Sequence, residues 1–113
     1  MIQVNEIRQG NYLLDRFNEI EELIQFDTFN WLEDDYCGIK LNDDWFNNCG
    51  FSKKVLKTKT FYTNGNVEFE KGNKRSGFYY LRGWKGYHKG IKYLHELQNL
   101  YFNLIGDDLT VSN

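Results

Sequence analysis

The sequence predicts an α+β domain in which a small antiparallel sheet packs against a C-terminal amphipathic helix. Three observations indicate this fold class: helical periodicity over residues 91–105, strand-like alternation in the segments before it, and a second, short capped helix at about residues 43–49. The chain of 113 residues contains no internal repeat, linker or low-complexity segment, so we expect a single domain over residues 1–113. Three Trp, eight Tyr and nine Phe supply much of the apolar surface for its core.

The first third of the chain predicts strands. The Gly10-Asn11 turn dipeptide leads into an apolar strand at residues 12–14. Residues 19–32 fit neither period cleanly; we favour a strand there, with a helix as the alternative. Residues 33–35 form an acidic turn before a short strand at residues 36–41.

The next segment has the signals of a compact helix at both ends. Asn42 is a good N-cap, and Asp43 and Asp44 in the first turn suit the positive end of the helix dipole. Gly50 closes the helix. Its buried side is expected to consist of Trp45, Phe46 and Cys49.

A run of strands and turns should follow. Within residues 55–62, apolar side chains alternate with lysines and threonines, as in a half-exposed strand. Asn64-Gly65 is a strong tight-turn signal, and it leads into residues 67–69. Residues 71–77 are a polar turn, and residues 78–82 are a further strand. We therefore expect at least three antiparallel strands before the long helix.

The C-terminal helix is the clearest element. Its apolar side is formed by Leu94, Leu97, Leu100, Tyr101, Leu104 and Ile105, with Ile91 at the margin. The other side is formed by Lys92, His95, Glu96, Asn99 and Asn103. Gly106 is the expected left-handed C-cap. Residues 108–112 either add a last short strand or run along the surface.

Charge is unevenly distributed along a chain whose net charge is only −2. Residues 1–50 carry eleven acids and three bases, whereas residues 51–93 carry eleven bases and two acids. The two segments either neutralise each other on a mixed surface or present a basic face to nucleic acid or an acidic partner.

The two cysteines, Cys37 and Cys49, are too few for a disulfide framework, and we interpret both as buried thiols. With no signal peptide evident, a reducing cytoplasm is the expected location. No apolar run approaches the roughly 18 residues of a membrane helix, so a soluble protein is expected.

Residues suited to catalysis or metal binding are few. His88 and His95 are seven residues apart and do not form a metal motif with the cysteines, so we expect no metal, no cofactor and no catalytic residues. If the protein is an enzyme after all, its carboxylates lie between Glu33 and Asp44. The same acidic patch could instead mimic phosphates in a basic groove of another protein.

The most suggestive segment covers residues 71–93, where cations and rings are interleaved. Single-stranded nucleic acid is bound by such materials, because cations follow the phosphates and exposed rings stack on bases. We expect Phe78 and Tyr80 in the core and Tyr79 exposed. Residues 83–86 match the GxxG pattern of KH domains but follow a strand instead of joining two helices. The candidate binding residues are Lys74, Arg75, Arg82, Trp84, Lys85, Tyr87, His88 and Lys89.

Three blocks of the chain stand out together: NEIRQGNY at residues 5–12, LNDDWF at residues 41–46 with Cys49-Gly50-Phe51, and IKYLHELQNLYF at residues 91–102 with Gly106 and Leu109. In this order they resemble a family of small phage and prophage proteins of Bacteroidota-type bacteria. Residues 51–90 do not share this resemblance. It implies a phage or mobile-element accessory protein, a class that includes anti-CRISPR antagonists of host immunity.

The expected function is therefore binding without catalysis. The expected partner is a host protein or ribonucleoprotein, with a CRISPR effector as the leading candidate and direct contact with RNA possible. One alternative is an RNA or single-stranded DNA binding module with a housekeeping phage role, and another is a structural phage component.

Overall fold

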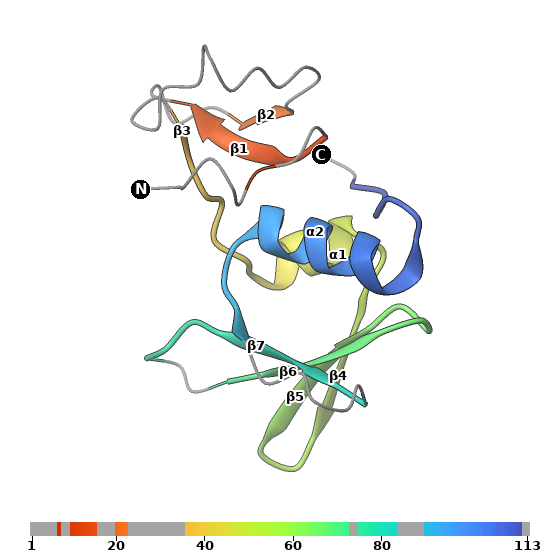
Figure 1. The fold of residues 1–113 in the computed structure, drawn as a ribbon. Coiled ribbons are helices and arrows are strands. Elements are labelled where there is room, and N and C mark those ends of the chain that lie inside the picture. The colour runs from red at the N-terminus through yellow and green to blue at the C-terminus, as the bar shows by residue number, and fades with distance from the viewer. Residues whose placement is uncertain are drawn as a thin grey trace.

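A computed structural model describes residues 7, 10–15, 20–22, 36–72, 75–83 and 90–111 of the protein. The predicted α+β class is confirmed. Two helices form a layer between a three-stranded and a five-stranded sheet, with the smaller sheet above and the larger one below in Figure 1.

The smaller sheet is antiparallel, with the strand order β2-β1-β3. Its strands are β1 (Tyr12–Asp15), β2 (Ile20–Glu22) and β3 (Tyr36–Cys37). The predicted strand at residues 12–14 is confirmed, and β2 agrees with the strand favoured for the start of residues 19–32. The rest of that segment and the acidic turn at residues 33–35 lie outside the described residues. The strand predicted for residues 36–41 is too long, since β3 ends at Cys37.

The short helix α1 (Asp43–Asn48) begins and ends where its capping signals predict. The Asn42 side chain accepts a hydrogen bond from the Trp45 backbone N–H at 2.9 Å. Phe46 and Cys49 are buried as expected, whereas Trp45 is only half-buried. The chain leaves the helix through Gly50, whose φ of +83° is easy only for glycine.

The larger sheet is antiparallel throughout, and its strands follow one another in chain order. They are β4 (Ser52–Leu56), β5 (Lys59–Thr63), β6 (Glu68–Lys71), β7 (Tyr79–Arg82) and β8 (Gly90–Ile91). The hairpin predicted at Asn64-Gly65 is confirmed between β5 and β6. The single strand predicted for residues 55–62 is wrong, because a two-residue turn at Lys57 and Thr58 folds it into the β4–β5 hairpin.

The long helix α2 (Leu94–Ile105) begins three residues later than its apolar margin predicts. Ile91 pairs with Tyr79 as part of β8. The Glu96 carboxylate then accepts hydrogen bonds from the backbone N–H groups of Lys92 and Tyr93 at 2.9 and 3.0 Å, which fixes the start of the helix. Gly106 is the left-handed C-cap, as predicted.

The polar side assigned to α2 is partly wrong. His95 is only 1% exposed, and its ring stacks on that of Tyr93 at a centroid distance of 5.8 Å. Gln98, which was assigned to neither side, is buried too, and its carboxamide is paired: its oxygen accepts from the Tyr12 N–H at 2.9 Å and its nitrogen donates to the Gly10 carbonyl at 3.1 Å. A helix between two sheets is buried on two sides, so its polar positions also enter the interior.

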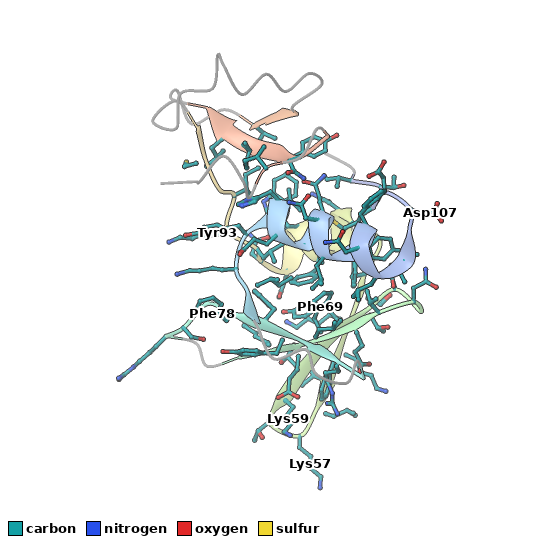
Figure 2. The ribbon with its side chains drawn as sticks, in the orientation of Figure 1. Lys57, Lys59, Phe69, Phe78, Tyr93 and Asp107 are labelled. Carbon is teal, nitrogen blue, oxygen red and sulfur yellow. The ribbon has the colours of Figure 1, made fainter. Side chains whose placement is uncertain are left out.

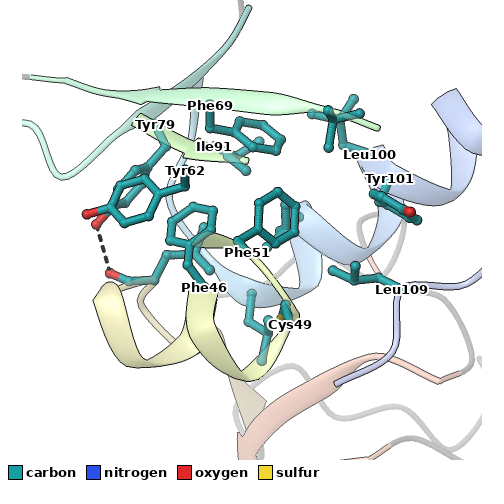
Figure 3. Close-up of a cluster of buried hydrophobic side chains, with 14 of the residues drawn as sticks. Phe46, Cys49, Phe51, Tyr62, Phe69, Tyr79, Ile91, Leu100, Tyr101 and Leu109 are labelled. Carbon is teal, nitrogen blue, oxygen red and sulfur yellow. Dashed lines mark hydrogen bonds between the residues drawn. The ribbon is translucent and has the colours of Figure 1, made fainter. Parts of the chain in front are cut away.

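The core lies between the helices and the larger sheet and is rich in rings (Figure 3). Phe46 stacks on Tyr62 at 4.3 Å and meets Tyr79 edge-on at 4.9 Å. The Tyr79 hydroxyl donates to the Leu41 carbonyl at 3.5 Å. Leu109 also enters this core, and residues 107–111 form no strand.

The two cysteines differ in their surroundings. Cys49 is buried, and burial raises the pKa of its thiol to about 12. Cys37 is exposed, which corrects the prediction of two buried thiols. Among the described residues, neither helix is both long and apolar enough to cross a membrane.

Candidate interaction surface

The side of the larger sheet that points away from α1 and α2 is the candidate site, and we call it the outer face. Side chains alternate between the two sides of a strand, and paired residues on neighbouring strands share a side. Tyr62, Phe69 and Leu81 point to the helices, so the register assigns their strand neighbours to the opposite side. The outer face is formed by Lys54, Leu56, Lys59, Phe61, Glu68, Glu70, Phe78, Tyr80 and Arg82.

The rings of β7 and of the residue before it lie on the opposite sides from those predicted. Tyr79 is buried against the helices, whereas Phe78 and Tyr80 are 37% and 41% exposed. Three consecutive rings give no period-two signal, and a shift of one residue reverses every side chain of a strand. The side that buries Tyr79 also buries Leu81, which places Arg82 with the exposed rings.

The Tyr80 ring lies close to the backbone of the sheet, between Gly72 and Gly90 on the two neighbouring chain segments. A Cβ atom on Gly72 would be 2.7 Å from Tyr80 Cε2, and one on Gly90 would be 2.9 Å from Tyr80 Cε1. These two carbons are on opposite edges of the ring, so the ring spans the space that two side chains would otherwise fill. The glycines therefore let Tyr80 rest against the backbone.

A cation accompanies each of two rings beside Tyr80. The Lys92 Nζ atom lies 5.7 Å from the centre of the Phe78 ring, and the Arg82 guanidinium lies 4.8 Å from the centre of the Phe61 ring. Arg82 also donates to the Glu70 carboxylate at 3.3 Å. The guanidinium is thus held in place by a ring and a carboxylate while its side chain stays 45% exposed.

The outer face continues to the end of the β4–β5 hairpin. Figure 2 shows Lys57 and Lys59 at the tip, far from the helices. A shallow pocket of about 520 Å³ lies there, lined by Leu56, Lys57, Thr58, Lys59 and Phe61. Leu56 is 50% exposed, so this end of the outer face combines an exposed apolar side chain with positive charge.

The structure describes two of the eight predicted binding residues. Arg82 is on the outer face, and Arg75 is exposed in the turn between β6 and β7. The other six lie outside the described residues: Lys74, Trp84, Lys85, Tyr87, His88 and Lys89. So does most of the GxxG segment, of which Gly83 is described.

Several residues of the outer face were missed by the sequence-based choice. Lys59 and Phe61 come from the segment read as one strand, and Lys54 directly precedes it, so the hairpin that turns them towards β7 was not predicted. Phe78 and Tyr80 were assigned to the core. The two glycines beside Tyr80 were the only signal for its position, and they are 18 residues apart in the sequence.

A second polar cluster lies on the helix side of the same sheet. The Asp43 carboxylate accepts hydrogen bonds from the Tyr62 hydroxyl and from Lys53 Nζ, the latter at 2.8 Å. The hydrogen bond from Lys53 and then that from Tyr62 lower the pKa of Asp43, whereas burial and Asp43 raise the pKa of Tyr62. These shifts keep the carboxylate ionised and the hydroxyl protonated, which suits a structural contact between α1 and the sheet.

The acidic residues around α1 do not form a metal site in the described part of the chain. A polar pocket of about 420 Å³ is lined by Asn42, Asp43, Asp44, Lys71 and Tyr79. No group of three or more His, Cys, Asp or Glu side chains in the described ranges is placed to hold a metal ion.

Comparison with known proteins gives no further assignment. No protein-family model, curated protein sequence or solved structure matches this chain.

Proposed function

We propose that the protein acts by binding a host ribonucleoprotein through the outer face of its larger sheet. The observation that carries this proposal is the set of exposed rings and cations on one surface: Phe78 and Tyr80 with Arg82 and Lys92 beside them. Tyr and Arg side chains contribute much of the free energy at interfaces, and the cations suit a partner that carries phosphates.

The kind of ribonucleoprotein is proposed from the sequence resemblance. A phage or mobile-element accessory protein acts in the cytoplasm of a bacterial host, where immune complexes containing RNA are its natural targets. A CRISPR effector is the leading candidate, which would make the protein an anti-CRISPR-like inhibitor. This proposal requires no catalytic residues, metal or cofactor.

A pull-down of the tagged protein from host lysate tests the proposal. The bait should be the wild-type chain and the Arg82→Glu variant, with Lys40→Glu as the matched control, because Lys40 is an exposed cation outside the larger sheet. A partner bound by wild type and Lys40→Glu but lost with Arg82→Glu supports the proposal. A partner retained equally by the folded Arg82→Glu variant contradicts it.

The second candidate function is that of a free-standing RNA or single-stranded DNA binding module. The position of Tyr80 favours it, because an exposed ring resting on glycines suits base stacking. RNase treatment of the same lysate separates the candidates. Partners that disappear with the RNA favour the nucleic-acid module, and a partner that survives favours inhibition of a protein-containing complex.

A further inference from the structure

We propose that the outer face contacts a single-stranded nucleic acid directly and that the Tyr80 ring is the platform on which a base stacks. This inference rests on the proposed function, since it assigns the nucleic-acid part of the target to a particular ring. It concerns Tyr80, Phe78, Arg82 and Lys92, and it requires none of the residues outside the described ranges.

The first argument is the way the Tyr80 ring is supported. A stacking platform needs one ring face against the protein and the other accessible to a base. The Cε1 and Cε2 edges of the ring approach Gly90 and Gly72, so the backbone of the flanking segments supports it from both sides. The residue is nevertheless 41% exposed. A larger side chain at either glycine would collide with the ring at less than 3.0 Å.

The second argument is a neighbouring ring, that of Phe78, directly before the start of β7. The centres of the Phe78 and Tyr80 rings are 6.4 Å apart, and their planes are inclined by 39°. Phe78 is 37% exposed, so both rings are available to a ligand. Two adjacent rings on an open sheet can take two bases of one strand, which is how sheet-based RNA-binding modules use their aromatic residues.

The third argument is the position of the cations. Lys92 lies over Phe78 on one side of Tyr80, and Arg82 follows Tyr80 on the same side of β7. A base stacked on Tyr80 would therefore have a cation near the phosphate on either side. The outer face also contains Glu68 and Glu70, but Glu70 accepts the hydrogen bond that holds Arg82 over Phe61. Bases inside a duplex are already paired and stacked on one another, so exposed rings arranged in this way favour a single strand.

Fluorescence anisotropy with labelled oligonucleotides tests the inference. Oligouridylate and oligothymidylate of about twelve nucleotides match the site sizes of stacking proteins and form little structure of their own. Binding of either by the wild-type chain at about 50 mM salt is expected, and the tighter of the two identifies RNA or DNA as the source of the base.

Substitutions at Tyr80 make the test specific. Tyr80→Ala should weaken binding about tenfold, since it removes one stacking ring, whereas Tyr80→Phe should stay within about twofold of wild type. Tyr80→Leu keeps an apolar side chain over the glycines without a π face and should also lose about fivefold or more. Phe102→Ala is the matched control, because Phe102 is a 37% exposed ring on α2 instead of the sheet, and it should bind as wild type does.

The outcome that overturns the inference is wild-type affinity in a folded Tyr80→Leu or Tyr80→Ala variant, with folding checked by circular dichroism. Absence of any oligonucleotide binding by the wild-type chain overturns it as well. If binding is absent while an RNase-resistant partner still depends on Arg82, base stacking fails and the proposed function stands. If oligonucleotides bind through Tyr80 but no host partner depends on Arg82, the proposed function fails instead.

Discussion

At the scale of single residues, Asp43 connects three parts of the fold. It lies in the first turn of α1, accepts a hydrogen bond from Lys53 of β4 and accepts another from Tyr62 of β5. The carboxylate thus fixes the short helix to the sheet whose outer face we propose as the binding surface. Because the Asp43 side chain is 49% exposed, solvent screens part of its attraction to Lys53.

Asp43→Asn should reduce the free energy of unfolding by about 1 kcal/mol at pH 7, since both hydrogen bonds lose their charged acceptor. The pKa of Asp43 is lower in the folded protein than its usual value of 3.8. Its contribution is therefore fully present above about pH 4 and is lost as the pH falls through the folded-state pKa. Urea unfolding at a series of pH values measures the effect.

The control for Asp43 is Tyr62→Phe, which removes one of its donors and leaves the carboxylate in place. It should lower stability as well, and it should reduce the difference in stability between neutral and acidic pH. If the free energies of unfolding of the wild-type chain and the Asp43→Asn variant differ by the same amount at pH 7 and at about pH 2, this role for the carboxylate is contradicted.

The residue-level predictions that succeeded depended on local contacts. Asn42 caps α1 through an N–H three residues away, and Gly106 ends α2 through its own φ angle. Tyr80 and His95 were placed wrongly because their positions depend on elements distant in the sequence. The side of β7 that is buried is set by α1, and the burial of His95 is set by packing on both sides of α2. Arg82 is the residue of the outer face that the sequence analysis named as a binding residue, because its charge alone was enough to select it.

At the scale of elements, the β4–β5 hairpin shows why one turn was predicted and another was missed. Asn64 and Gly65 have the side-chain chemistry of a tight turn, and Asn64 accepts from the N–H groups of Asn66 and Val67. The earlier turn consists of Lys57 and Thr58, which carry no such signal. It forms because Val55 and Leu56 pair with Thr60 and Lys59.

Lys57→Gly should stabilise the hairpin, because Lys57 has a φ of +56°, a conformation that glycine adopts without steric cost. Relief of the positive φ should add about 0.5 to 1 kcal/mol to the free energy of unfolding, and the greater freedom of glycine in the unfolded chain offsets part of this gain. It should appear as a rise of about 3 °C in the melting temperature. Thermal unfolding followed by circular dichroism measures it.

Thr58→Gly is the matched control for this turn. Thr58 does not have a positive φ, so glycine there adds freedom to the unfolded chain without relieving any strain. It should lower the melting temperature. A fall in melting temperature with Lys57→Gly would show that the Lys57 side chain contributes more than its backbone conformation costs.

At the scale of the whole molecule, the two segments of unequal charge supply the strands of two different sheets. The acidic first segment supplies β1, β2 and β3, the basic segment supplies β4 to β8, and the helices lie between the two sheets (Figure 1). The salt bridge between Lys53 and Asp43 joins the two segments, but the strands themselves lie on opposite sides of the helical layer. A negatively charged partner is therefore expected at the larger sheet.

The cations of the larger sheet should make the proposed contact with nucleic acid strongly dependent on salt. The outer face and its margin offer Lys54, Lys59, Arg82 and Lys92 to phosphates. If all four neutralise a phosphate of a single strand, log K should fall with log salt concentration at a slope of about −3. Replacing both Lys54 and Lys59 with Gln should reduce that slope by about half, while Lys40→Gln should leave it unchanged because Lys40 is not part of the larger sheet. Anisotropy titrations between about 50 and 200 mM salt measure the slope. A slope near zero would mean that the cations of the outer face do not contact phosphates. The exposed rings would then be expected to bind a protein surface instead of a nucleic acid.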